Sequence, residues 1–289
     1  MEKYTNADFN KDFPTDDACL DWILANRWPD GVVCQKCQKV TSHYRIAGRP
    51  CYSCEFCGSH VYPMAGTIFQ STHLPLRQWF YAFSQMAVTR CGVSARQLGR
   101  DLGIRPNTAL RIWRQIRSIL VDGDTILTGK VEVDETYVGG KHRGGKRGRG
   151  AEGKTIVFGM VERGGNVIAQ VVPDVKARTL LPKIEAKVSK DATVYSDELQ
   201  SYNGVSKIGF THKVIAHAKG QYVLAKDIHT NSVEGFWSQL KRSIDGTYHH
   251  VTPRCLQFYV NEYAFRYSHR NDEEPMFWTM LGQMIRKAS

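Results

Sequence analysis

Three carboxylates in the second half of the chain stand at points where a strand is expected to end or a helix to begin. They are Asp134 in Val-Glu-Val-Asp-Glu-Thr-Tyr, Asp197 in Val-Tyr-Ser-Asp and Glu234 in Asn-Ser-Val-Glu-Gly-Phe-Trp. Hard carboxylate oxygens suit Mg²⁺, which prefers one or two carboxylates together with water and phosphate oxygens. Three such acids predict a catalytic site for two Mg²⁺ or Mn²⁺ ions and metal-dependent phosphodiester chemistry.

Acidic neighbours leave the identity of the first two ligands open. Side chains alternate along a strand, so Glu132 lies on the same face as Asp134. Glu135 adjoins Asp134, and Glu198 adjoins Asp197. Any of these three carboxylates is an alternative ligand.

Glu234 has a structural alternative of its own. Asn231 and Glu234 have the spacing of a helix-capping box, in which the acid reaches back to the amide of the capping residue. Lys241 favours the catalytic interpretation, because it follows Glu234 by seven residues and lies on the same helix face. Taken alone, Lys241 is better explained as an exposed lysine.

The elements around these acids predict a ribonuclease H-like α/β domain over residues 124–289. Alternating apolar residues indicate strands, and a tight turn at Arg163-Gly-Gly-Asn indicates a hairpin. The expected strands are residues 130–138, 155–162, 166–172, 192–196 and 213–216, with helices at 177–188 and from 232 onward. In that order the first strand is central and lies beside the fourth, so Asp134 and Asp197 should meet.

Five of the eight cysteines lie between residues 34 and 57. Cys34 with Cys37 and Cys54 with Cys57 form two Cys-x-x-Cys knuckles, the spacing of a four-thiolate structural Zn²⁺ site. Cys51 and Cys54 are also a valid knuckle, so Cys51 competes with Cys57. We expect residues 1–68 to hold an N-terminal segment and a zinc ribbon, whose small core the metal would stabilise.

Residues 69–123 are expected to form a helix-turn-helix DNA-binding region. Ser94 can cap a short helix that Gly103 ends, and a second helix follows from Asn107 or Thr108. Arginines recur at every third position of that second helix, namely Arg111, Arg114 and Arg117. This stripe is suited to phosphates or guanine edges, although a small helical bundle with solvent-facing arginines is the alternative.

The charge of the chain favours a polyanionic partner. A formal net charge of +11 and a pI near 9.3 attract phosphates, whose neutralisation releases counterions. Residues 139–154 are rich in glycine and in basic residues, including Lys141, Arg143, Lys146 and Arg147. We expect this segment to be either an arm that contacts DNA or a solvated loop. No apolar run reaches the length of a membrane span, so we expect a cytoplasmic protein without a membrane partner.

Several motifs resemble the zinc-ribbon DDE transposases of the ISXO type, insertion-sequence relatives of the Merlin transposases. The resemblance extends over nearly the whole chain. Its motifs are Arg27-Trp-Pro-Asp-Gly, Gly66-Thr-Ile-Phe, Val131-Glu-Val-Asp-Glu-Thr-Tyr-Val-Gly-Gly-Lys, Tyr195-Ser-Asp, His229-Thr-Asn-Ser-Val-Glu-Gly-Phe-Trp-Ser-Gln-Leu-Lys-Arg and Tyr248-His-His-Val. It implies that Asp134, Asp197 and Glu234 are the acidic triad and Lys241 its basic companion. Some relatives carry Asn as the third residue, which makes Asn231 a neighbour of interest.

The resemblance implies a transposase associated with the bacterial nucleoid. Such an enzyme binds the terminal inverted repeats of its element, hydrolyses a strand at each end and joins the 3′-hydroxyl to target DNA, acting as a homodimer or larger oligomer. Two alternatives remain from the sequence. One is a zinc-ribbon and helix-turn-helix regulator with a non-catalytic ribonuclease H-like domain, and the other is a nuclease or resolvase without strand transfer.

Overall fold

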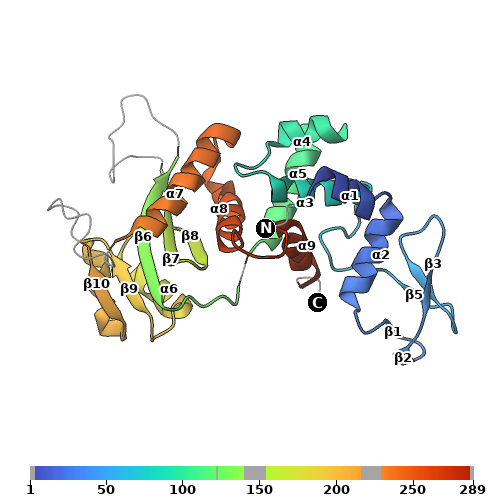
Figure 1. Ribbon diagram of the computed structural model, residues 1–289, viewed down its shortest axis with the longest axis horizontal. Coiled ribbons are helices and arrows are strands. Elements are labelled where there is room, and N and C mark those ends of the chain that lie inside the picture. Colours follow the sequence, from blue (N-terminus) through green and yellow to red (C-terminus); the bar gives the residue numbers. More distant parts are fainter. Residues whose placement is uncertain (1–3, 122, 140–153, 216–228, 287–289) are drawn as a thin grey trace. The chain divides into compact units, whose positions relative to one another are not determined.

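The computed structural model describes residues 4–121, 123–139, 154–215 and 229–286 (Figure 1). The chain forms two compact units, one made of Met1–Ile119 with Asp272–Ser289 and the other of Leu120–Asn271. Each unit has buried apolar residues of its own. Among the described residues, no helix combines the length and the apolar character needed to cross a membrane.

The second unit is built on a five-stranded sheet with β6 (Lys130–Val138) at its centre. β6 pairs antiparallel with β7 (Thr155–Glu162), which pairs antiparallel with β8 (Val167–Val172). On the other side of β6, β9 (Thr193–Ser196) and then β10 (Thr211–Val214) continue the sheet in parallel. The order β10-β9-β6-β7-β8 is that of a ribonuclease H-like domain, and this predicted fold class is confirmed.

Helices cover both faces of this sheet. They are α6 (Ala177–Lys187), α7 (Asn231–Ser243) and α8 (Pro253–Ser268), with 3-10 turns at Gln200–Tyr202 and Ser206–Ile208 and a π-helical turn at Ile244–Tyr248. Ile184 of α6 packs in a core with Val133. Leu240 of α7 packs in a second core with Val157. Because β6 side chains alternate, Val131 and Val133 face the first core, whereas Glu132 and Asp134 face α7.

The strand bounds agree with the sequence expectation to within one residue, except at β10. The predicted strand at residues 213–216 lies at Thr211–Val214, two residues earlier. The parallel register with β9, in which Thr211 is opposite Thr193, explains the shift. Gly164 has the positive φ of 78° that the predicted tight turn after β7 requires.

The N-terminal unit begins with helices and a small ribbon. β1 (Val33–Cys34) and β2 (Lys39–Val40) form one antiparallel hairpin. The sheet of the ribbon consists of β3 (His43–Arg45), β4 (Tyr52–Cys54) and β5 (His60–Val61). The helices of this unit are α1 (Asn6–Asp12), α2 (Asp16–Arg27), α3 (Leu76–Val88), α4 (Ala95–Leu102), α5 (Pro106–Ile119) and α9 (Met276–Arg286).

Helices α4 and α5 form the pair in which a helix-turn-helix was expected. The Ser94 hydroxyl caps α4 by accepting from the Gln97 amide at 3.1 Å, and Gly103 ends it with a left-handed φ of 65°. At Gly99 a Cβ would lie 2.9 Å from the Ile104 carbonyl oxygen, so glycine permits the close turn. These features agree with the predicted helix bounds, except that α5 begins at Pro106. DNA recognition by this pair stays a prediction.

Arg117 corrects the expected basic stripe. Arg111 and Arg114 are exposed, but Arg117 is only 1% exposed, and its guanidinium lies 5.9 Å from the Trp113 ring centroid. Each residue of a helix turns by about 100°, so Arg117 is rotated by about 120° from Arg111 and approaches the buried face of Trp113 and Ile116. The exposed basic surface of α5 is therefore shorter than the sequence suggested.

The C-terminal helix α9 belongs to the N-terminal unit. The sequence expectation extended the ribonuclease H-like domain to residue 289, but Asp272–Ser289 cluster with Met1–Ile119. The Phe277 ring stacks on Tyr4 at 4.3 Å between centroids and contacts Phe13 at 5.9 Å. These aromatic contacts bury large apolar surfaces and explain why the chain returns to its first unit.

Replacing Phe277 by Ala should destabilise the N-terminal unit by about 3–5 kcal/mol, the usual cost of removing a buried phenyl ring. Urea unfolding followed by circular dichroism measures the change. Phe56→Ala is the control, because the Phe56 side chain is 63% exposed and its loss should change stability by less than about 0.5 kcal/mol. Equal stability of both variants would contradict the docking of α9.

Candidate active site and cysteine cluster

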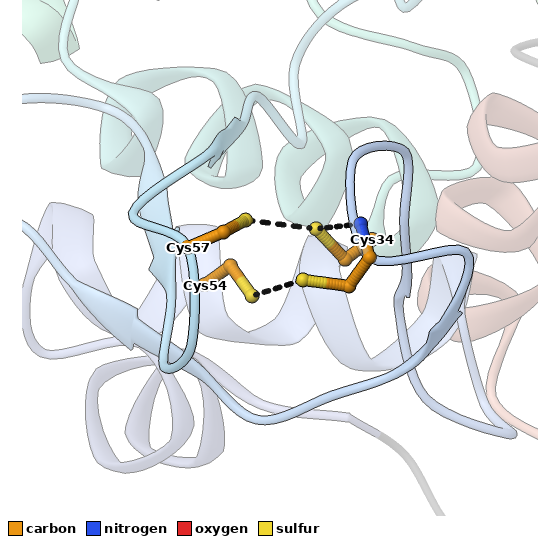
Figure 2. Close-up of side chains that lie close together, drawn as sticks. Cys34, Cys54 and Cys57 are labelled. Atoms are coloured by element: carbon orange, nitrogen blue, oxygen red, sulfur yellow. Dashed lines mark hydrogen bonds between the residues drawn. The ribbon is translucent and has the colours of Figure 1, made fainter.

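The two cysteine knuckles converge in the ribbon. The ligand atoms of Cys34, Cys37, Cys54 and Cys57 all lie within 4.8 Å of one another. Figure 2 shows Cys34, Cys54 and Cys57 with their sulfur atoms directed into one cluster. Cys34 Sγ lies 3.5 Å from Cys57 Sγ, and Cys37 Sγ lies 3.9 Å from Cys54 Sγ. Zn–S bonds of about 2.3 Å in a tetrahedron require sulfur separations of about 3.8 Å, so the cluster has the size of a zinc site.

The thiol environment also favours a cation. A hydrogen bond from the Thr41 hydroxyl, 3.3 Å from Cys54 Sγ, lowers the pKa of the Cys54 thiol to about 6. The crowded thiols, above all that of Cys57, raise the pKa of Cys37 to about 12. Four adjacent thiolates repel one another, and a dication at their centre would offset that repulsion.

Two other residues of the ribbon that could ligate a metal ion, Cys51 and His60, lie outside the cluster. Cys51 is fully buried and does not belong to the converging group. His60 lies on β5 and is also not part of it. The structure thus brings Cys57, rather than Cys51, to the other three cysteines.

Asp134 and Asp197 are brought together by the strand register. Glu132 pairs with Tyr195 where β6 and β9 run parallel. Two residues further along both strands, Asp134 is level with Asp197, directly after the end of β9. The Asp197 carboxylate is close enough to help raise the pKa of Asp134. The expected meeting of these two acids is therefore present in the fold.

Glu234 and Lys241 meet Asp134 in a pocket of about 550 Å³ between β6 and α7. Positions 234, 237, 238 and 241 line it because they recur on one face of α7. Partial burial lowers the pKa of the Lys241 ammonium, and the Asp134 carboxylate opposes that shift. The pocket thus joins carboxylates and a cation, as the sequence predicted for these residues.

The surroundings of Asp134 disfavour its ionised form. Burial and the neighbouring Glu135 carboxylate raise the pKa of Asp134 to about 7. A hydrogen bond from the indole Nε1 of Trp237, 2.9 Å from Oδ2, opposes the shift. A cation bound beside Asp134 would favour the ionised carboxylate.

Of the three alternative ligands, Glu135 lines the pocket beside Asp134, whereas Glu132 and Glu198 lie outside its lining. Glu132 is fully buried and accepts from Arg163 Nε at 2.7 Å and from the Val233 amide at 2.9 Å. Glu135 accepts from the Tyr202 hydroxyl at 3.0 Å. Glu198 is exposed, beyond the pocket lining.

The capping box that was the structural alternative for Asn231 and Glu234 is not formed. Helix α7 has Thr230 as its N-cap residue, without a side-chain capping bond, and Glu234 is the fourth helical residue. The Glu132 carboxylate instead accepts from the first turn of α7 through Val233. Glu234 accepts a long hydrogen bond from the Thr230 hydroxyl at 3.3 Å and is exposed to the pocket.

Trp237 and Lys154 are among the pocket residues that were not singled out from the sequence. Trp237 follows Glu234 by three residues, so its helical spacing was a usable signal. Lys154 precedes β7 and adds a second cation beside Lys241. The basic candidates Lys141, Arg143, Lys146 and Arg147 lie outside the described residues.

The three acids do not form a single compact ligand group. Within the described ranges, the four cysteines are the one set of three or more His, Cys, Asp or Glu donors that converges to metal-binding distance. Two-metal sites hold their ions about 3.5–4 Å apart and distribute the carboxylates between them. Asp134 and Glu234 share the pocket, and Asp197 follows the end of the neighbouring strand β9.

The chain is similar to proteins of mobile elements. A Halobacterium salinarum protein described as "uncharacterized protein in transposable element ISH50" is 27% identical over 283 residues, covering 89% of this chain and 94% of that protein. An "uncharacterized transposase-like protein" of Haemophilus influenzae is 28% identical over 120 residues, covering 42% of this chain and 94% of that protein. A chain of the solved pre-cleavage Mos1 transpososome has a TM-score of 0.29 and 11% identity, covering 68% of this chain and 72% of that chain, too low a score to support an argument.

Two domain families match the chain in sequence. Residues 126–268 match the ISXO2-like transposase domain, and this range contains Asp134, Asp197, Glu234 and Lys241. Residues 14–60 match the transposase zinc-ribbon domain, and this range contains the four converging cysteines. With both domains in this order, the chain belongs to the zinc-ribbon insertion-sequence transposases of the ISXO type, a family of DNA-processing enzymes.

Proposed function

We propose that this transposase binds the terminal inverted repeats of its own element, cuts a strand at each end and joins the freed 3′-hydroxyl to target DNA. The pocket that joins Asp134, Glu234 and Lys241 carries the proposal. Carboxylates for metal ions and an ammonium for phosphate are the groups that phosphodiester chemistry requires. The adjacent Asp197 supplies the third acid.

The donor set fits two Mg²⁺ or Mn²⁺ ions. Asp134, Asp197 and Glu234 offer hard oxygen ligands, and the open pocket leaves room for water and phosphate oxygens. When bound, such ions activate the attacking water or 3′-hydroxyl and stabilise the leaving oxygen. Lys241 and Lys154 would attract the phosphates next to the cut, and the indole of Trp237 closes one wall of the pocket.

The N-terminal unit would bind the element ends. Cys34, Cys37, Cys54 and Cys57 would hold a structural Zn²⁺, which stabilises the ribbon. The exposed Arg111 and Arg114 of α5 would contact the DNA backbone. A homodimer or larger oligomer at the nucleoid would bring two ends together.

Incubation with end-labelled terminal DNA, Mg²⁺ and a plasmid target tests the proposed activity. Cleaved ends joined to the target support the transposase. Cleavage without joining would indicate a nuclease or resolvase. Binding without cleavage would indicate a regulator.

Asp134→Asn, Asp197→Asn and Glu234→Gln should each reduce cleavage and strand transfer at least about 100-fold, because each removes a negative ligand oxygen at nearly constant volume. The variants should still fold and bind terminal DNA. Gel assays of cleavage and band-shift assays measure the two properties separately. Near-normal Mg²⁺-dependent cleavage by Glu234→Gln would contradict the acidic triad.

Glu198→Gln is the matched control for the triad variants. Its carboxylate is exposed and lies next to Asp197, so activity should stay within roughly tenfold of the parent. Glu132→Gln and Glu135→Gln are poorer controls, since both side chains are buried and hydrogen-bonded.

Cys34→Ser and Cys57→Ser should each lose zinc and unfold the ribbon, while the ribonuclease H-like domain stays folded. Elemental analysis should find about one zinc per parent chain and far less in the variants. Cys51→Ala should retain zinc, because Cys51 lies outside the cluster. A parent protein that is purified without zinc would disprove the metal assignment.

Replacing Arg111 and Arg114 together by Ala should weaken binding to terminal DNA and lower the slope of log affinity against log salt by about 2, because two phosphate contacts are lost. Lys176→Ala with Arg178→Ala removes the same charge from exposed positions of the other unit and should leave the slope nearly unchanged. Identical slopes for both double variants would return α4 and α5 to the helical-bundle interpretation.

A further inference from the structure

Trp237 is built into the candidate active site by two contacts from two strands. Its indole Nε1 donates to Asp134 Oδ2 at 2.9 Å. The ring also rests on Gly159 of β7, where an added Cβ would lie 2.6 Å from both Cζ2 and Cη2 of the indole. Asp134 and Gly159 are opposite one another in the antiparallel register of β6 and β7. The indole therefore spans the strand pair and reaches the carboxylate.

The hydrogen bond from Trp237 restricts the rotation of the Asp134 carboxylate. A carboxylate that faces a pocket can rotate, and a hydrogen bond to one oxygen fixes the plane of the group. The indole is itself fixed, because Trp237 is only 5% exposed and belongs to the core of Phe236 and Leu240. Because the ring is held in the core, its N–H donor stays in place and keeps the Asp134 carboxylate in one orientation.

We propose that Trp237, seated on Gly159, is a positioning residue that orients Asp134 toward a divalent cation. The inference rests on the proposed two-metal function and adds to it the group that fixes the first ligand. Ligating carboxylates are commonly held by such hydrogen bonds, whose removal lowers metal affinity about 10- to 100-fold. Glu234 lies three residues before Trp237 on α7, so the same helix face supplies one acid and orients another.

Trp237→Phe separates orientation from packing. A phenyl ring retains most of the apolar contact but has no N–H donor. Calorimetric titration of the zinc-loaded full-length chain with Mn²⁺ should show about 10-fold weaker binding for this variant. Cleavage assays should show a matching rise in the Mn²⁺ concentration needed for half-maximal rate.

Trp113→Phe is the matched control. Trp113 is also buried, and its Nε1 has no hydrogen-bond partner among the described residues. The Trp113 variant should therefore bind Mn²⁺ like the parent, although it carries the same change of side chain.

Gly159→Ala tests the seat of the indole while leaving its donor in place. The added methyl group should displace the ring and weaken Mn²⁺ binding by a similar factor. Combined with Trp237→Phe, it should cause little further loss, because both changes remove one interaction.

The Asp134→Asn and Trp237→Phe variants together separate the positioning role of Trp237 from the proposed metal site on which it rests. Asp134→Asn should abolish the Mn²⁺ binding seen in the calorimeter. If that variant loses binding while Trp237→Phe binds as tightly as the parent, the positioning role is refuted and the metal site stands. If Asp134→Asn binds Mn²⁺ normally, both the metal site and the positioning role are overturned.

Discussion

The buried carboxylate of Glu132 ties the central strand β6 to the start of helix α7, and the geometry of the candidate site depends on this tie. It accepts from the Val233 amide in the first turn of α7 and from Arg163, which follows β7. Burying a carboxylate is costly unless it is paired, and here a guanidinium and the positive end of a helix both compensate it. The interaction therefore fixes where α7 begins relative to the sheet.

Once the start of α7 is fixed, helical spacing determines what faces Asp134. Glu234, Trp237 and Lys241 lie on one face of the helix, and all three line the pocket. Asp134 follows Glu132 by two residues, so the alternation of β6 turns both carboxylates toward α7. The same face of β6 thus carries Glu132, whose charge is compensated by Arg163, and Asp134, which faces an open pocket.

Features that depend on local periodicity, such as the positions of the strands, could be predicted from the sequence. Features that depend on contacts between residues distant in sequence could not. Alternation and turn residues located the strands, and the strand order placed Asp134 beside Asp197. Glu132 and Asp134 share that alternation, and contacts of Glu132 with Arg163 and Val233, both distant in sequence, separate the roles of the two acids. Arg117 was misplaced because spacing by three residues drifts around a helix toward its buried face. The docking of α9 depends on aromatic contacts across almost the whole chain.

The charges of the pocket couple the binding of metal ions to the binding of DNA. Asp134, Glu135 and Glu234 line a pocket that also holds Lys154 and Lys241. Burial, followed by the negative charge of Glu135, raises the pKa of Asp134. A DNA phosphate would add to this repulsion, although the lysines attract it. Dications between the carboxylates and the phosphate would remove the conflict. Metal affinity should therefore increase when DNA is bound, and by linkage DNA should bind the site more tightly when metal is present.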